Sequence, residues 1–176
     1  MGISLHEGWT VLHGTLFGAA LLLAFVGGLA GLYGLMPGQG VSREAVKHIL
    51  RLKIMVWSAA LIAWVTVITG TFIVYPWYGA AAPTSAEVTP TPYDRLLSNA
   101  VTADWNNFGM AWKQHVGWLA PIAATVVAFA VTYYGPQLAK RTDERRALMV
   151  FFVIAFAAAA TAGVFGALLN KVAPIS

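Results

Sequence analysis

Four long apolar stretches constrain the fold of this 176-residue chain more than any other feature of its sequence. A membrane-spanning helix needs about 20 apolar residues, because each residue adds about 1.5 Å and the hydrocarbon core is about 30 Å thick. The first stretch contains no Asp, Glu, Lys or Arg between Gly8 and Ser42. The four stretches cover about residues 9–36, 54–77, 108–137 and 147–170. The sequence therefore predicts an all-α protein, a single integral membrane domain (1–176) built as a transmembrane four-helix bundle.

The composition excludes several classes of protein. Only 10% of the residues are charged, whereas about a quarter are charged in soluble domains. The chain has no cysteine, which excludes disulfide frameworks, thiolate zinc sites, iron–sulfur clusters and covalently attached haem. The net charge of +4 is explained by membrane orientation, so we expect no nucleic-acid partner.

Basic residues predict how the chain sits in the membrane. Eight of the eleven lie in two short linkers, at Arg43, Lys47, Arg51, Lys53, Lys140, Arg141, Arg145 and Arg146. The positive-inside rule places these linkers in the cytoplasm. Both termini and a long outer loop, about residues 78–107, are then expected on the outer (periplasmic) side of a bacterial inner membrane. Within this loop, Thr91, Pro92 and Asp94 have the order of a helix start and predict a short interfacial helix near 92–101.

Ionisable residues at membrane depth are functional candidates, because burying them in lipid is expensive. We place all seven acidic residues in tails and loops and no lysine or arginine inside a span, which leaves His13 and His115. Their distances from the predicted outer boundary differ by about 5 Å in depth at 1.5 Å per residue. Two imidazoles at similar depth on different helices can ligate one haem iron, which without cysteine is noncovalent haem b. The lack of buried acids argues against catalysis by this chain alone.

Small and basic residues near the two histidines extend this interpretation. Gly14 and Gly18 follow His13 and either leave room for a macrocycle or form a helix-packing groove. Lys113 and Arg95 are the outer-face cations that we expect to bind the haem propionates.

The two remaining histidines admit more than one interpretation. His6 lies seven residues before His13, so it is a further propionate donor or a solvated tail residue. His48 lies on the predicted cytoplasmic side without a histidine at its depth, where Met36 or Met149 could complete a His/Met site.

Other residues indicate helix packing. Gly27 and Gly31 have the spacing of a close-packing groove. Trp57 and Trp64 are seven residues apart and are expected to face one neighbouring helix. We expect Thr66, Thr69 and Thr71 to bond back to helix carbonyls or to link helices.

With four predicted spans and the outer-side pair His13 and His115, the sequence resembles small four-helix b-type cytochromes of respiratory and photosynthetic membranes. The resemblance implies an electron-transfer subunit of an oxidoreductase complex, with other membrane subunits and a quinone or outer-face electron carrier as partners.

Two alternatives stay open. One is a cofactor-free scaffold subunit, and the other is a chlorophyll-binding protein in which a single histidine ligates magnesium. A shared haem needs both histidines to face one gap, whereas a chlorophyll needs one that faces lipid or a partner.

Overall fold

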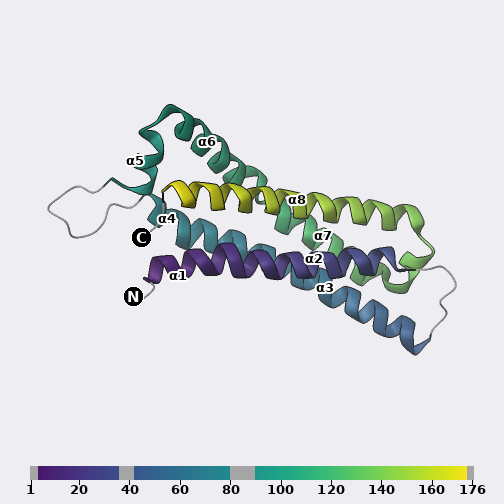
Figure 1. The fold of residues 1–176 in the computed structure, drawn as a ribbon. Coiled ribbons are helices and arrows are strands. Elements are labelled where there is room, and N and C mark those ends of the chain that lie inside the picture. Colours follow the sequence, from purple (N-terminus) through teal and green to yellow (C-terminus); the bar gives the residue numbers. More distant parts are fainter. Residues whose placement is uncertain (1–3, 36–41, 80–89, 174–176) are drawn as a thin grey trace.

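The computed structural model describes residues 4–35, 42–79 and 90–173, and every regular element within these ranges is a helix (Figure 1). Four helices are long and apolar enough to cross a membrane, at Leu5–Tyr33, Arg43–Tyr78, Ala100–Ala139 and Thr142–Val172. The predicted all-helical fold with four candidate spans is therefore confirmed. The helices are longer than most of the predicted spans, because polar residues at their ends extend each helix beyond its apolar stretch.

Three of the four long helices are composite. The first consists of α1 (Leu5–Val11), the π-helical turn η1 (Leu12–Leu16) and α2 (Phe17–Tyr33). The second consists of α3 (Arg43–Thr69), the π-helical turn η2 (Gly70–Val74) and α4 (Tyr75–Tyr78). The third joins α6 (Ala100–Ala111), the π-helical turn η3 (Trp112–Val116), α7 (Leu119–Tyr134) and the 3₁₀ turn η4 (Gly135–Ala139). The fourth is the single helix α8 (Thr142–Val172), and the short helix α5 (Pro92–Leu97) precedes α6.

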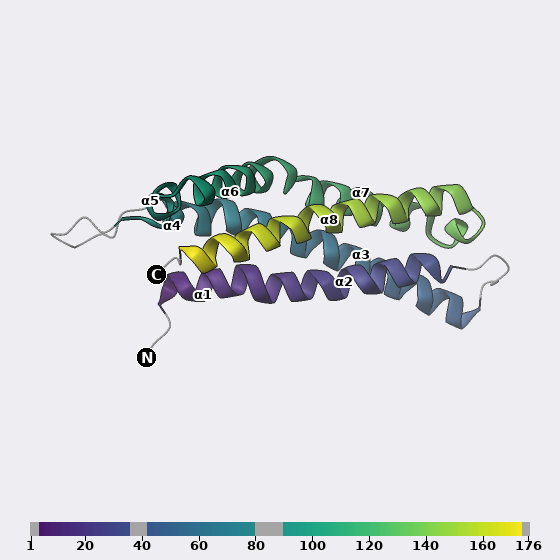
Figure 2. The ribbon, with the colours of Figure 1, turned by 45° about the horizontal axis from the view of Figure 1, so that its top comes forward.

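The long helices lie side by side, and the first and last described residues are at the same end (Figures 1 and 2). We call this the terminal end, where α1, α4, α5 and the last turn of α8 meet. We call the opposite end the basic end, because the eight basic residues named above lie there, in the first turns of α3 and α8 and just before α8. Residues 80–89 of the predicted outer loop and Met36 lie outside the described residues.

Side-chain caps fix where α3, α5 and α6 begin. The Ser42 hydroxyl accepts a hydrogen bond from the Ala45 amide at 3.1 Å and caps α3. Thr91 and Asp94 form a reciprocal capping box at the start of α5, which confirms the predicted helix start. This helix ends at Leu97 and not near residue 101, because Asn99 caps a new helix, α6.

Glycines bring α2 close to its neighbours, as the Gly27 and Gly31 spacing predicted. A Cβ at Gly31 would lie 2.9 Å from Cδ1 of Leu52 on α3, and one at Gly27 would lie 2.8 Å from the Met55 sulfur. The core continues between α3, α7 and α8. Its most buried large side chains include Leu32, Leu52, Val56, Val127, Val131, Leu138 and Phe152.

Two tryptophan–threonine pairs join α3 to α7. The Trp57 indole donates to the Thr132 hydroxyl at 2.9 Å, and the Trp64 indole donates to the Thr125 hydroxyl at 3.0 Å. Both threonines use their own proton on a carbonyl four residues earlier, so their oxygens are available as acceptors. The prediction that both tryptophans face one neighbour is confirmed.

Side chains from two other helices bind carbonyls at and just beyond the end of α2. Nε2 of His48 on α3 donates to the Gly31 carbonyl at 3.0 Å, and Nη1 of Arg145 on α8 donates to the Leu35 carbonyl. The last carbonyls of a helix have no partner within it and carry partial negative charge, which donors of this kind stabilise. His48 and Arg145 therefore hold the basic end together.

Candidate functional site

Two of the three π-helical turns in the described residues carry the histidines and the lysine that lie nearest the middle of the long helices. His13 lies in η1, Lys113 and His115 lie in η3, and Gly70 begins η2. Two of the turns are neighbours, because η1 packs against α3 and η2 packs against α1. A π turn widens the helix locally and is frequent at functional sites. The layer formed by these turns is therefore the candidate site.

The His13 imidazole is held by the second helix. Nδ1 of His13 lies 3.1 Å from the Thr69 hydroxyl oxygen, which itself lies 2.7 Å from the Val65 carbonyl. A hydroxyl has one proton, and Thr69 donates it to a backbone carbonyl. Nδ1 of His13 must therefore be the donor in the contact with Thr69, and Nε2 is the unprotonated nitrogen of the neutral ring.

Gly70 allows the His13 ring to pack directly against the backbone of the second helix. A Cβ at Gly70 would lie 2.7 Å from Cε1 and 3.1 Å from Nε2 of His13. The first of these distances is too short for any side chain larger than that of glycine unless the imidazole moves. The sequence predicted back-bonding for Thr69, which is confirmed, but it gave no signal that Thr69 and Gly70 bind His13.

Lys113 corrects the prediction that no lysine or arginine lies inside a span. It lies within the candidate span Ala100–Ala139, well beyond the start of that helix. Its side chain is half-buried, interacts electrostatically with His13, and brings Nζ to 3.4 Å from the position of a Cβ on Gly166 of α8. The hydropathy pattern had placed Lys113 near the outer boundary of the third predicted span, because Asp104 and its polar neighbours lower the mean hydropathy of α6.

His115 lies on the surface of the third helix. Its side chain is exposed, and Nδ1 lies 2.9 Å from the Ala111 carbonyl one turn earlier. A carbonyl only accepts, so Nδ1 carries the proton and Nε2 is the nitrogen available to a ligand. Residues two apart on a helix face different sides, which agrees with Lys113 lying against the bundle while its neighbour His115 is exposed.

The remaining predicted site residues lie apart from this layer or on its surface. Gly14 and Gly18 are exposed, and no neighbouring atom lies within 4 Å of a Cβ built on either. Arg95 is exposed in the last turn of α5. The His6 ring stacks on Trp77, with their centroids 4.2 Å apart. The structure thus brings His13 and Lys113 together, and it leaves His115 exposed on the surface of the third helix.

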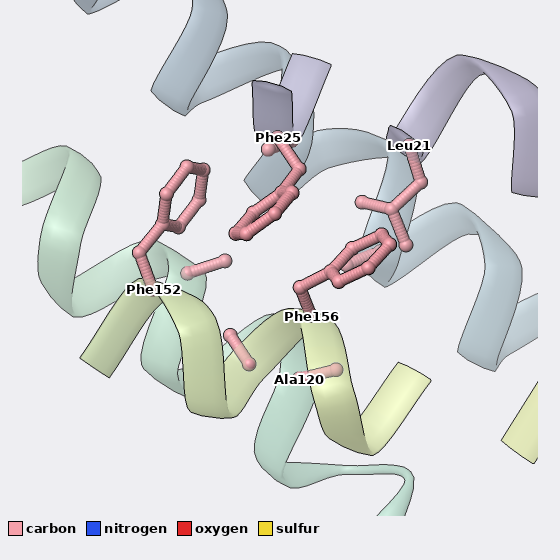
Figure 3. A pocket seen from close by; sticks show the side chains of 9 residues that line it. Leu21, Phe25, Ala120, Phe152 and Phe156 are labelled. Atoms are coloured by element: carbon pink, nitrogen blue, oxygen red, sulfur yellow. The ribbon is translucent and has the colours of Figure 1, made fainter. Parts of the chain in front are cut away.

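We tested whether this arrangement fits a haem. Figure 3 shows a cavity between the helices near Leu21, Phe25 and Phe156. Its volume is about 10 Å³ and its lining is apolar, so it has room for one water molecule at most and none for a macrocycle. The donor chemistry fits at His115, whose exposed ring offers an unprotonated Nε2. Within the described ranges no three His, Asp or Glu side chains gather as a metal site, but a haem iron takes only one or two protein ligands.

Comparisons of the chain with known protein families, with curated proteins and with solved structures found no match.

Proposed function

We propose that this chain is a membrane electron-transfer subunit of a larger respiratory or photosynthetic complex, and that it binds one noncovalent haem b near the terminal end. The observation that carries the proposal is the hydrogen bond from Nδ1 of His115 to the Ala111 carbonyl. This bond fixes the ring and its tautomer and leaves Nε2 for iron, as a carbonyl that accepts from the other ring nitrogen does for metal-ligating histidines.

His13 supports the proposal through the same tautomer. Its Nδ1 donates to Thr69, so its Nε2 is also unprotonated. The ring lies against Gly70 in the interior, and it becomes the second axial ligand, as the sequence predicted, only by leaving this position. Of the two histidines, the geometry therefore favours His115 as an iron ligand.

Other residues near His115 suit a macrocycle at the helix surface. Phe108 and Trp112 precede it on the third helix, with ring centroids 6.3 Å apart, although both also contact α8, Phe108 through the Phe165 ring and Trp112 through the Ala158 carbonyl. They offer apolar surface that excludes water from the iron ligand. Arg95, which is exposed in the last turn of α5, remains a proposed partner of a propionate, whereas Lys113 lies against Gly166 of α8 and binds the other propionate only by leaving this position. A bound haem supplies one-electron redox chemistry, which the protein side chains named here do not provide.

A chlorophyll is the second candidate. Its magnesium takes a single imidazole, and the exposed position of His115 offers one to lipid or to a partner. This candidate differs from haem b in its metal, so absorption spectra distinguish the two.

The test is the reduced-minus-oxidised visible spectrum of the protein purified from its native membrane, together with a pyridine haemochrome assay. We expect the spectrum of a haem b, which His115→Ala removes. His48→Ala is the matched control, because His48 caps α2 at the opposite end, and it should leave the spectrum unchanged. Magnesium-chlorin absorption would replace haem by chlorophyll. A colourless, folded protein would refute both and favour the scaffold alternative.

A further inference from the structure

Lys113 is a half-buried cation that has no counter-ion within the described part of the chain. Its Nζ makes no hydrogen bond and no ion pair with the residues described there. The ion pairs of those residues lie at the basic end, where Lys47 binds Glu44 and Arg141 binds Glu144. The charge of Lys113 is therefore unbalanced by the bundle that surrounds it.

The elements packed around Lys113 place no acid beside it. Asp104 lies nine residues earlier on the third helix, about 13.5 Å along the helix axis. Glu7 lies six residues before His13 on the first helix, and its carboxylate is used in the capping box of α1. α8 carries its acids in its first turn, at the basic end. Since a charge at membrane depth is expensive unless it is paired, Lys113 requires an anion from outside this part of the chain.

Nζ of Lys113 is open to a ligand from outside the bundle. The residue of α8 next to it is Gly166, which has no side chain to cover it, and a Cβ there would lie 3.4 Å from Nζ. Within the described ranges, the side-chain nitrogen or oxygen that is fully enclosed and lacks a hydrogen bond is Nε of Arg145. Nζ of Lys113 also lacks a hydrogen bond, so it is not fully enclosed. A single ligand oxygen can therefore approach it without a cavity inside the bundle.

Two helix lengths place Lys113 at the depth of lipid headgroups. On α8, Gly166 lies 20 residues after Arg146 of the basic end, which is about 30 Å and matches the thickness of the hydrocarbon core. On the third helix, Lys140 lies 27 residues after Lys113, which is about 40 Å and matches a bilayer with its headgroup regions. With the basic end at one membrane surface, Nζ of Lys113 lies at the boundary of the opposite leaflet, where the phosphate groups of lipids are.

We infer that Nζ of Lys113 binds the phosphate group of a phospholipid in the leaflet at the terminal end, beside η1, η3 and α8. A lysine ammonium binds phosphate as a point charge, and anionic headgroups are attracted to basic residues at a membrane surface. The acyl chains stay in the bilayer, so the site needs room only for a headgroup oxygen. The inference does not rest on haem binding, because Lys113 binds the lipid from the position that it already occupies, and Arg95 remains for a propionate.

Thermal unfolding of the purified chain, delipidated in an uncharged detergent, tests the site with three probes. The first is dioctanoyl phosphatidylglycerol, the second is inorganic phosphate, and the third is dioctanoylglycerol, which has the acyl chains without the phosphate. We expect the phospholipid to raise the Tm by about 3–6 °C at ten times its Kd. The other two probes should leave the Tm unchanged at the same concentration, because the headgroup is held at Lys113 only when its acyl chains are anchored in the micelle.

Three variants assign the response to Lys113. Lys113→Met keeps the length of the side chain but removes its charge, and it should abolish the rise in Tm. Lys113→Arg keeps the charge and should retain the rise. Lys171→Met is the matched control, because Lys171 is an exposed lysine in the last turn of α8 at the same end, and it should also retain the rise.

Each contrary result overturns the inference. An equal rise in Tm with inorganic phosphate would show a site for free anions and not for a lipid. A rise with dioctanoylglycerol would show that the acyl chains act without the phosphate. A rise that persists in Lys113→Met, or that is lost equally in Lys171→Met, would refute a specific site at Lys113. None of these results bears on the haem spectrum, which tests the proposed function separately.

Discussion

Gly70→Ala is the substitution that most directly tests the geometry around His13. The added methyl group would lie 2.7 Å from Cε1 and 3.1 Å from Nε2 of the imidazole. Since ordinary carbon contacts are near 3.5–4.0 Å, the ring must move. His13 is anchored through its 3.1 Å contact with Thr69, so moving the ring breaks or bends that hydrogen bond. We expect Gly70→Ala to destabilise the fold and to change the environment of the His13 nitrogens.

The magnitude follows from three contributions. Forcing an extra methyl into a packed site costs about 1–3 kcal/mol. Loss of the hydrogen bond between His13 and Thr69 adds about 1 kcal/mol. Alanine is favoured over glycine in a helix by about 1 kcal/mol, which offsets part of the loss. The free energy of unfolding should therefore fall by about 1–3 kcal/mol, and the Tm by about 3–10 °C for a chain of this size.

The assay is thermal unfolding in detergent followed by circular dichroism, with ¹⁵N NMR of the histidine side chains as a second readout. Gly18→Ala is the matched control, because a Cβ there has no neighbour within 4 Å, and it should leave Tm unchanged or raise it. An unchanged Tm in Gly70→Ala, together with unchanged His13 nitrogen signals, would refute the placement of the imidazole against the second helix.

Three further substitutions test the contacts that hold the helices together, each by thermal unfolding in detergent. Trp64→Phe removes a 3.0 Å hydrogen bond and should lower the free energy of unfolding by about 1 kcal/mol, but by less in a Thr125→Val background if the two side chains are coupled. Arg145→Met leaves a carbonyl after α2 without its donor, so we expect the free energy of unfolding to fall by about 1–3 kcal/mol. Arg146→Met, at an exposed position, should change it by less than about 0.5 kcal/mol. Equal effects of the two substitutions would contradict the capping role of Arg145. Tyr78→Phe leaves a buried asparagine side chain without its donor and should cost about 1–3 kcal/mol; wild-type stability would show that the amide finds another partner.

The sequence predicted the helices well, because their signals are long and local. Each span exceeds the length that a hydrocarbon core requires, and Ser42, Thr91 and Asp94 supply local hydrogen bonds at helix starts. The seven-residue interval between Trp57 and Trp64 correctly placed both on one face. It could not identify α7 as the neighbour, since periodicity describes one helix and not its partner.

The sequence could not predict which way the side chains of the candidate site residues face. Residue counting gives depth, because every helical residue adds a similar rise, but the π turns at His13 and His115 change the angular position of the residues that follow. The hydropathy pattern also gave no sign that a polar side chain of the third helix is buried. Asn106 lowers the apolar average there, yet it is buried and accepts a hydrogen bond from Tyr78. Burial of this kind depends on a partner distant in sequence.

The two tryptophan–threonine bonds between α3 and α7 also determine which internal motions this bundle permits. Trp57 bonds to Thr132 and Trp64 to Thr125, so the donors and the acceptors are both separated by seven residues. Sliding α3 along α7 by one turn, about 5.4 Å, would break both bonds and leave two indole donors without acceptors in an apolar medium. A slide of about 10.5 Å is needed before even one bond forms again. These two bonds therefore oppose sliding of α3 along α7, so a piston-like displacement in this protein is expected in the first or the fourth helix.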